Sequence, residues 1–166
     1  MIDFLKKQKI KGLAAWVLLS FLAAAVGGAA TVNAGTFYTE QLVLPAWAPP
    51  GGVFGPVWTV LYLLMGISAW LVWREGGFKK ARRALYVFIF QLVLNGLWSW
   101  LFFGWKLGGA AFANILILWV LLLTMDYFFM KKNKLAGFLQ VPYLLWVSFA
   151  AILNYYVWQL NPQILG

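Results

Sequence analysis

The sequence predicts an all-α membrane protein with five transmembrane helices in one bundle, the N-terminus inside and the C-terminus outside. Three observations lead to this prediction. The 166 residues are 64% hydrophobic and only 10% charged, whereas a soluble domain is about half apolar and about a quarter charged. The chain has five uncharged stretches of the length that a helix needs to cross a bilayer, roughly 20 residues. Most of its basic residues lie on alternate connections between these stretches.

The five spans are expected at residues 12–32, 53–73, 84–104, 107–125 and 135–160, with an outer cap loop over 33–52. They leave no room for a separate soluble domain, so residues 1–166 are interpreted as a single transmembrane domain. The first stretch follows a group of lysines, as in a signal peptide. Its apolar run is longer than a signal-peptide core, and we therefore interpret it as a span.

The basic residues determine the expected topology. Twelve of the 13 precede the first span, or lie between the second and third or the fourth and fifth, and Lys106 alone lies on the other side. This is the positive-inside pattern of multi-pass membrane proteins. The net charge of +9 therefore predicts orientation in a lipid bilayer, and no nucleic-acid partner is expected.

Missing residue types exclude several kinds of chemistry. The chain has no Cys and no His, which excludes disulfides, thiol nucleophiles, imidazole bases and Cys/His zinc sites. Its four acidic residues are too few and too scattered for a carboxylate metal cluster, so no metal site is expected. Asp126 lies about one turn before Lys131 and Lys132. An interfacial ion pair is the first interpretation of Asp126, and a proton relay is the alternative.

Residues 33–52 form a connection that is long for a compact fold, and such loops are usually functional or disordered. Trp47 lies there among Pro45, Pro49 and Pro50. We interpret the segment as an ordered outer cap. The alternative is a proline-rich loop that only sets the direction in which the next helix begins.

The third span carries polar and aromatic residues at intervals of three and four. Gln91, Asn95, Trp98, Ser99 and Phe102 share one helix face. Amides in a bilayer need partners, so this face is expected to point into the bundle. The pattern is compatible with hydrogen bonds between helices and with the wall of a ligand pocket.

Two other spans offer matching faces. The second carries Phe54 and Trp58, and the fifth carries the stripe Tyr143, Trp146, Ala150 and Leu153 with Asn154 beside it. A rise of about 1.5 Å per residue brings Trp58, Trp98, Asn154 and Asn95, from three helices, to the same outer half of the membrane, beneath the loop. An interior that is simply aromatic remains the alternative. In the first span, Ala23/Gly27 and Ala24/Gly28 predict close helix packing, within the bundle or across a dimer.

Motifs on three helices resemble one known family. They are Pro45, Trp47, Pro49 and Pro50 with Trp58 after them, Gln91 to Ser99 in the third span, and Pro142, Tyr143, Trp146, Asn154 and Trp158 in the fifth. Together they resemble the translocator protein family, also called tryptophan-rich sensory proteins or peripheral-type benzodiazepine receptors. The likeness covers nearly the whole chain and favours a bacterial member, located in the cell membrane.

The resemblance implies a homodimeric membrane protein that binds porphyrins, cholesterol and synthetic isoquinoline or benzodiazepine ligands in a pocket under the first loop. Periodicity and resemblance together give the predicted ligand-binding residues: Trp47, Phe54, Trp58, Asn95, Trp98, Ser99, Tyr143, Trp146, Ala150, Leu153 and Asn154. Gln159 stands where the family's cholesterol motif has a basic residue, and such motifs are weak even when complete. Porphyrin is therefore the preferred ligand.

Three functions are considered. The first is a receptor or translocator-like protein that binds porphyrins, with sensory or transport-regulatory output. The second is light- and oxygen-dependent porphyrin degradation, which the resemblance links to Trp58 and Trp146. The third is secondary transport of tetrapyrroles or sterols, although no inverted repeat is visible. Without His or Cys as axial ligands, a metal-free porphyrin is favoured. Its acidic groups are expected at the outer mouth near Lys106.

Overall fold

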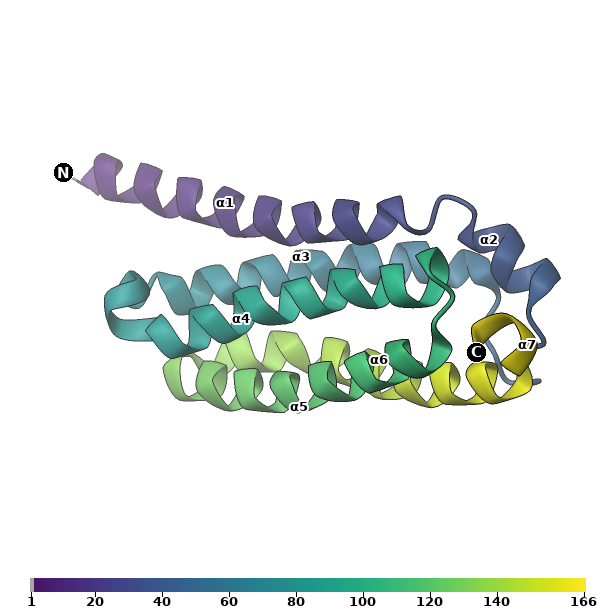
Figure 1. Ribbon diagram of the computed structural model, residues 1–166. Helices are drawn as coiled ribbons and strands as arrows, with labels where there is room; N and C mark the ends of the chain where they lie inside the picture. The colour runs from purple at the N-terminus through teal and green to yellow at the C-terminus, as the bar shows by residue number, and fades with distance from the viewer. Residues whose placement is uncertain (1) are drawn as a thin grey trace.

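The computed structural model describes residues 2–166, and the side chains of residues 10–166. Five long helices run back and forth in one bundle (Figure 1). They are α1 (Ile2–Ala29), α3 (Phe54–Trp73), α4 (Gly77–Ser99), α5 (Gly108–Lys132) and α6 (Lys134–Leu160). Each contains a segment long and apolar enough to cross a membrane. The predicted all-α fold with five spans is confirmed, while the orientation of the termini stays a prediction.

Helices α1 and α4 begin well before the expected spans. Helix α1 starts at Ile2 and α4 at Gly77, whereas the uncharged stretches begin about three and two turns later, respectively. The added turns are rich in Lys and Arg, which are good helix formers and belong in water. The uncharged stretches therefore predict the part of each helix that can cross a membrane, but they do not predict the residue at which the helix begins. At its other end α1 stops at Ala29, three residues before the expected end of the span.

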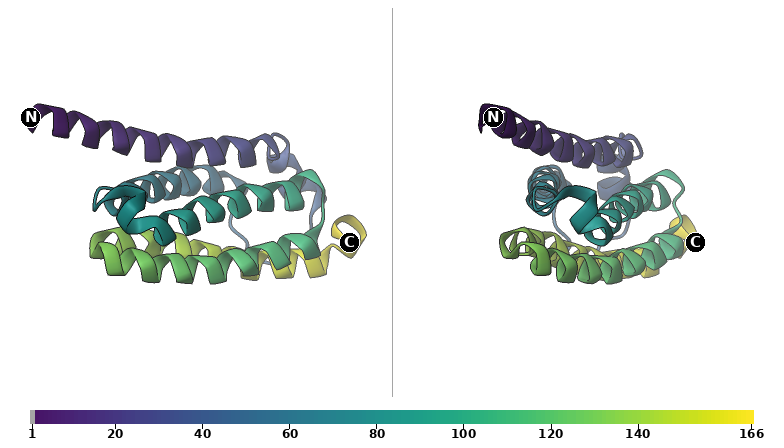
Figure 2. Two further views of the ribbon diagram at one scale, coloured as in Figure 1. Left: turned by 60° about the vertical axis from the view of Figure 1, so that its left-hand side comes forward. Right: turned by 90° about the vertical axis from the view of Figure 1, so that its left-hand side faces the viewer.

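The helices form three layers, with α3 and α4 between α1 and the α5–α6 pair (Figure 2). The turns α3–α4 and α5–α6 and the start of α1 lie at one end, which we call the basic end (Figure 1). The opposite end, the cap end, holds residues 33–52, a π-helical turn at Trp100–Gly104 and the short helix α7 (Pro162–Leu165). Residues 33–52 contain α2 (Ala34–Thr36) and a second π-helical turn, Phe37–Gln41.

Helices α5 and α6 are joined by one residue, Asn133, in an extended conformation. Its side-chain oxygen accepts a hydrogen bond from the backbone N–H of Ala136 at 3.1 Å and so caps α6. This tight turn makes the two helices antiparallel neighbours. Ring contacts between Phe112 and Tyr155, near the opposite end of the pair, show that the register is kept along the whole length.

Helices α1 and α3 approach closely at Gly66. A Cβ atom built there would lie 2.6 Å from the Cα of Val17, which is backbone and cannot rotate away. We therefore expect Gly66→Ala to lower the free energy of unfolding by about 2 kcal/mol, the usual cost of overpacking a tight contact. Denaturation of the purified protein in detergent measures this. The control is Gly28→Ala, where nothing lies within 4 Å; an equal loss in both variants would contradict the explanation.

Candidate functional site

A cavity of about 650 Å³ lies between the helices under residues 33–52. Its walls come from α1, α3, α4, α5 and α6 and from the cap end. Nine of the eleven residues predicted to bind ligand line it: Phe54, Trp58, Asn95, Trp98, Ser99, Trp146, Ala150, Leu153 and Asn154. Periodicity on three separate helices and the family resemblance had predicted these residues, and the structure brings them to one space.

Trp47 and Tyr143 were also predicted to bind ligand, but they lie outside the cavity lining. Trp47 is 47% exposed and packs edge-on against Phe149 and Tyr156 of α6, with ring centroids 5.9 and 5.6 Å apart. It fastens the loop to α6. Tyr143 is 1% exposed and lies under the cavity floor, where its hydroxyl joins a hydrogen-bond network.

That network forms the floor and connects three helices. Asn95 of α4 accepts a hydrogen bond from the hydroxyl of Tyr62 on α3 and donates one to the hydroxyl of Tyr143 on α6 at 2.8 Å. Tyr143 donates in turn to Gln91 at 2.9 Å. Hence the polar face of α4 has both roles that the sequence left open, namely hydrogen bonding between helices and forming the wall of a pocket. Gln91 bonds between helices, and Asn95 does so while lining the cavity.

A second set of bonds fixes the wall nearer the cap end. The indole N–H of Trp98 donates to Asn154 at 2.9 Å, and the amide of Asn154 donates to the carbonyl of Gly108 at 3.2 Å. The Trp98 ring is also stacked on Phe102, with centroids 5.3 Å apart. The hydrogen bond to Asn154 and the stacking on Phe102 both fix the Trp98 side chain, so its ring presents a preoriented aromatic surface to the cavity.

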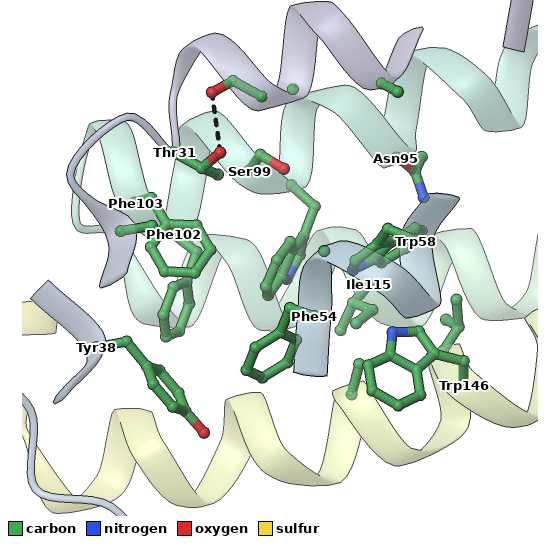
Figure 3. Close-up of a pocket in the computed structure, with 18 of the residues that line it drawn as sticks. Thr31, Tyr38, Phe54, Trp58, Asn95, Ser99, Phe102, Phe103, Ile115 and Trp146 are labelled. Carbon is green, nitrogen blue, oxygen red and sulfur yellow. Dashed lines mark hydrogen bonds between the residues drawn. The ribbon is translucent and has the colours of Figure 1, made fainter. Parts of the chain in front are cut away.

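Aromatic rings from α3 and α6 form the opposite side. Figure 3 shows Phe54, Trp58 and Trp146 around one space, with Tyr38, Phe102 and Phe103 beside them. Phe54 links Tyr38 and Trp146 through edge-to-face contacts at 5.3 and 6.0 Å. The indole N–H groups of Trp58 and Trp146 bond to no residue whose side chain is described. These two donors are therefore available to a ligand.

Residues 33–52 are held over the cavity by polar contacts. The Tyr38 hydroxyl donates to the carbonyl of Pro49 at 3.1 Å, and burial raises its pKa above the usual value of 10. The Asn161 side chain bonds both the N–H and the carbonyl of Val43, at 2.8 and 2.9 Å. These contacts fit the ordered cap expected from the sequence, and Tyr38 itself lines the cavity.

Sequence reasoning missed the contribution of α1. Ala24, Ala25, Gly27 and Gly28 line the cavity, whereas the spacing of Ala23/Gly27 and Ala24/Gly28 had suggested only packing within the bundle or a dimer face. Gly27 faces α4, where an added Cβ would lie 3.2 Å from the Ser99 hydroxyl, and Gly28 faces open space. Small residues allow close approach of helices, and they equally leave room for a ligand. Spacing alone could not separate these two uses.

The ion pair expected for Asp126 does not form among residues 10–166. One Asp126 carboxylate oxygen is buried without a hydrogen-bond partner, and so are both polar atoms of Gln140 on α6. Lys131 lies over the Tyr127 ring instead, with its nitrogen 4.4 Å from the centroid. Asp126 is half-buried and Lys131 and Lys132 are exposed, and neither lysine pairs with Asp126 in the part of the chain described at side-chain level.

Comparison with known proteins places these features in a family. The sequence profile described as the TspO/MBR family matches residues 15–159. The tryptophan-rich protein TspO of Chlorobaculum tepidum is 36% identical over 156 residues, covering 93% of this chain and 99% of that protein. The translocator protein of Homo sapiens is 38% identical over 138 residues, covering 82% of each chain. The tryptophan-rich sensory protein of Cereibacter sphaeroides is 35% identical, covering 88% of this chain and 92% of that protein.

Proposed function

Because the chain belongs to the TspO/MBR family of multi-pass integral membrane proteins, we propose that it binds a porphyrin in the cavity beneath residues 33–52. The names of its relatives, translocator protein and tryptophan-rich sensory protein, support a receptor- or translocator-like role. We propose that porphyrin binding controls a sensory or transport-regulatory output. The observation that carries the proposal is a large uncharged cavity bordered by three tryptophans from three helices.

The chemistry of the walls favours a flat aromatic ligand. A volume of about 650 Å³ falls in the range of ligand pockets, roughly 300–1,000 Å³. Trp58, Trp98 and Trp146 offer ring faces and edges for stacking. The lining holds no Asp, Glu, Lys or Arg, so a charged group buried in the cavity would lack a partner of opposite sign. Since the chain has neither His nor Cys, a metal-free porphyrin suits the site better than an axially ligated haem.

Titration with protoporphyrin IX tests binding. In non-ionic detergent, tryptophan fluorescence should be quenched in a saturable way, with one porphyrin bound per chain. The quenching arises because three tryptophans would lie against the macrocycle. Empty micelles with an equal amount of free tryptophan derivative serve as the control. Quenching that rises linearly without saturation, as in the control, would overturn the proposal.

A second function, photo-oxidative degradation of the bound porphyrin, is favoured by one observation. Trp58 and Trp146 both border the cavity and both have unpartnered indole N–H groups among the described residues. The porphyrin would absorb the light and molecular oxygen would be the oxidant, so the missing His and Cys do not prevent the reaction. Loss of porphyrin absorbance under illumination should then be faster in the complex than in micelles. Equal rates would exclude the enzymatic function.

Family membership also supports two proposals about the assembly, namely a homodimer and a location in the cell membrane. In α5, Gly109 is not available for a dimer face, because a Cβ atom there would lie 2.9 Å from the Trp158 ring of the same chain. Gly109 therefore serves packing within the bundle.

A further inference from the structure

A second pocket, of about 470 Å³, opens beside the main cavity at the cap end. Residues from the end of α1, from the segment 32–41 and from the turn after α4 line it. Ala34 and Phe103 border both spaces, so the two pockets are neighbours. The walls differ in character. The main cavity has no charged side chain, whereas the second pocket contains Lys106 together with amide and hydroxyl groups.

The backbone around Lys106 determines where its side chain begins. Lys106 has φ +55°, an uncommon conformation for a residue with a side chain. Hydrogen bonds on both sides maintain it: Trp105 N–H donates to the Trp100 carbonyl at 2.7 Å, and Leu107 N–H to the Leu101 carbonyl at 2.8 Å. The position of Lys106 is therefore set by the turn between α4 and α5.

The ammonium group of Lys106 is directed toward the segment that covers the cavity. Its nitrogen lies 4.7 Å from the centroid of the Phe37 ring, which is 5% exposed and packs edge-on against Phe103 at 6.2 Å. Cation–π contact holds the charge at this position without neutralising it. Lys106 forms no ion pair with any described side chain, Glu40 included. An anionic partner could thus reach it.

Three uncharged polar side chains surround the same pocket. Asn33, Thr36 and Gln41 line it, and none of the three makes a side-chain hydrogen bond within the part of the chain described at side-chain level. Their amide and hydroxyl groups are donors that suit carboxylate oxygens. By sequence, the other 12 basic residues belong to the basic end. Positive charge next to the cavity is therefore concentrated at Lys106.

From this arrangement we infer that the second pocket binds the carboxylate groups of the ligand whose apolar body fills the main cavity. Lys106 supplies the charge, and Asn33, Thr36 and Gln41 supply hydrogen bonds. The inference rests on the proposed function, because it assumes that the main cavity is occupied. It adds a requirement for ligand chemistry: the preferred ligand is an amphipathic anion, with an aromatic body and at least one carboxylate at its edge.

The test compares protoporphyrin IX, which carries two carboxylates, with its uncharged dimethyl ester. Dissociation constants are measured in non-ionic detergent, so that no lipid phosphate competes for the pocket. Lys106→Gln should weaken binding of the free acid about fivefold, the upper range for an exposed ion pair, and leave binding of the ester unchanged. Lys106→Arg should retain the wild-type difference. High salt should reduce the preference of the wild-type protein for the acid.

The matched control is Lys131→Gln, which removes the same charge at the basic end, where Lys131 also lies over an aromatic ring. It should leave both dissociation constants unchanged. If Lys106→Gln weakened acid and ester equally, Lys106 would act only by supporting Phe37, and the inference would be wrong. If it weakened neither, the pocket would not hold the carboxylate. Failure of the ester to bind the wild-type protein would instead count against the main cavity as the site, so the two failures are distinguishable.

Discussion

Replacing Trp58 and Trp146 together with alanine is expected to weaken porphyrin binding by about 100-fold. Each ring borders the cavity from a different helix, α3 and α6. Stacking of an aromatic ligand on such a ring contributes about 1–3 kcal/mol on truncation to alanine, or roughly tenfold in affinity for each residue. Dissociation constants from porphyrin absorbance give the readout, since removing tryptophans also changes the fluorescence signal.

Two further variants make this experiment specific. Trp105→Ala removes a tryptophan that is 55% exposed and outside the cavity lining, and should leave the affinity unchanged. Replacing Trp58 and Trp146 with phenylalanine keeps an aromatic face and should retain most of the binding. If the double variant Trp58→Ala, Trp146→Ala bound porphyrin as tightly as the wild-type protein, the cavity would not be the porphyrin site.

Replacing Asn95 with leucine is expected to lower the free energy of unfolding by about 3 kcal/mol. Asn95 is 4% exposed and bonds the hydroxyls of Tyr62 and Tyr143. Leucine is similar in size, but it cannot form the hydrogen bonds to the hydroxyls of Tyr62 and Tyr143. Each buried polar group left without its partner costs about 1–3 kcal/mol. Bonds between membrane helices tend toward the lower values. Thermal or denaturant unfolding in detergent measures the loss.

The triple variant Asn95→Leu, Tyr62→Phe, Tyr143→Phe separates orphaned polar groups from poor packing. The triple variant removes both hydroxyls that Asn95 bonds and leaves only the Gln91 carbonyl oxygen without its donor, so it should recover part of the stability lost in Asn95→Leu alone. If the triple variant were less stable than the single one by the sum of the separate losses, the network would not be the cause.

Much of the site could be predicted because helical periodicity places side chains on faces. Asn95 and Trp98 share one face of α4, and Asn154 lies on the matching face of α6; the structure joins Trp98 to Asn154 directly. Depth counted along each helix brought Trp58, Trp98 and Asn154 to similar levels. Such inferences depend only on a regular rise per residue and a polar group's need for a partner.

The remaining features depend on packing, which periodicity does not determine. Tyr143 lies on the predicted stripe, but it is one turn too deep and forms the floor with Gln91. Trp47 belongs to a loop, where no regular repeat gives its direction, and it packs on the outside of α6. Gly28 has no side chain, so no pattern of polar or aromatic residues in the sequence could indicate that it lines the cavity. Sequence therefore predicted the polar and aromatic walls better than the small-residue wall of α1.

A structure of the complex with protoporphyrin IX tests the proposed site most directly. We expect the macrocycle between Trp58, Trp98 and Trp146, with its carboxylates toward Lys106 at the cap end. A macrocycle bound on a lipid-facing surface, with the cavity unoccupied, would contradict the proposal.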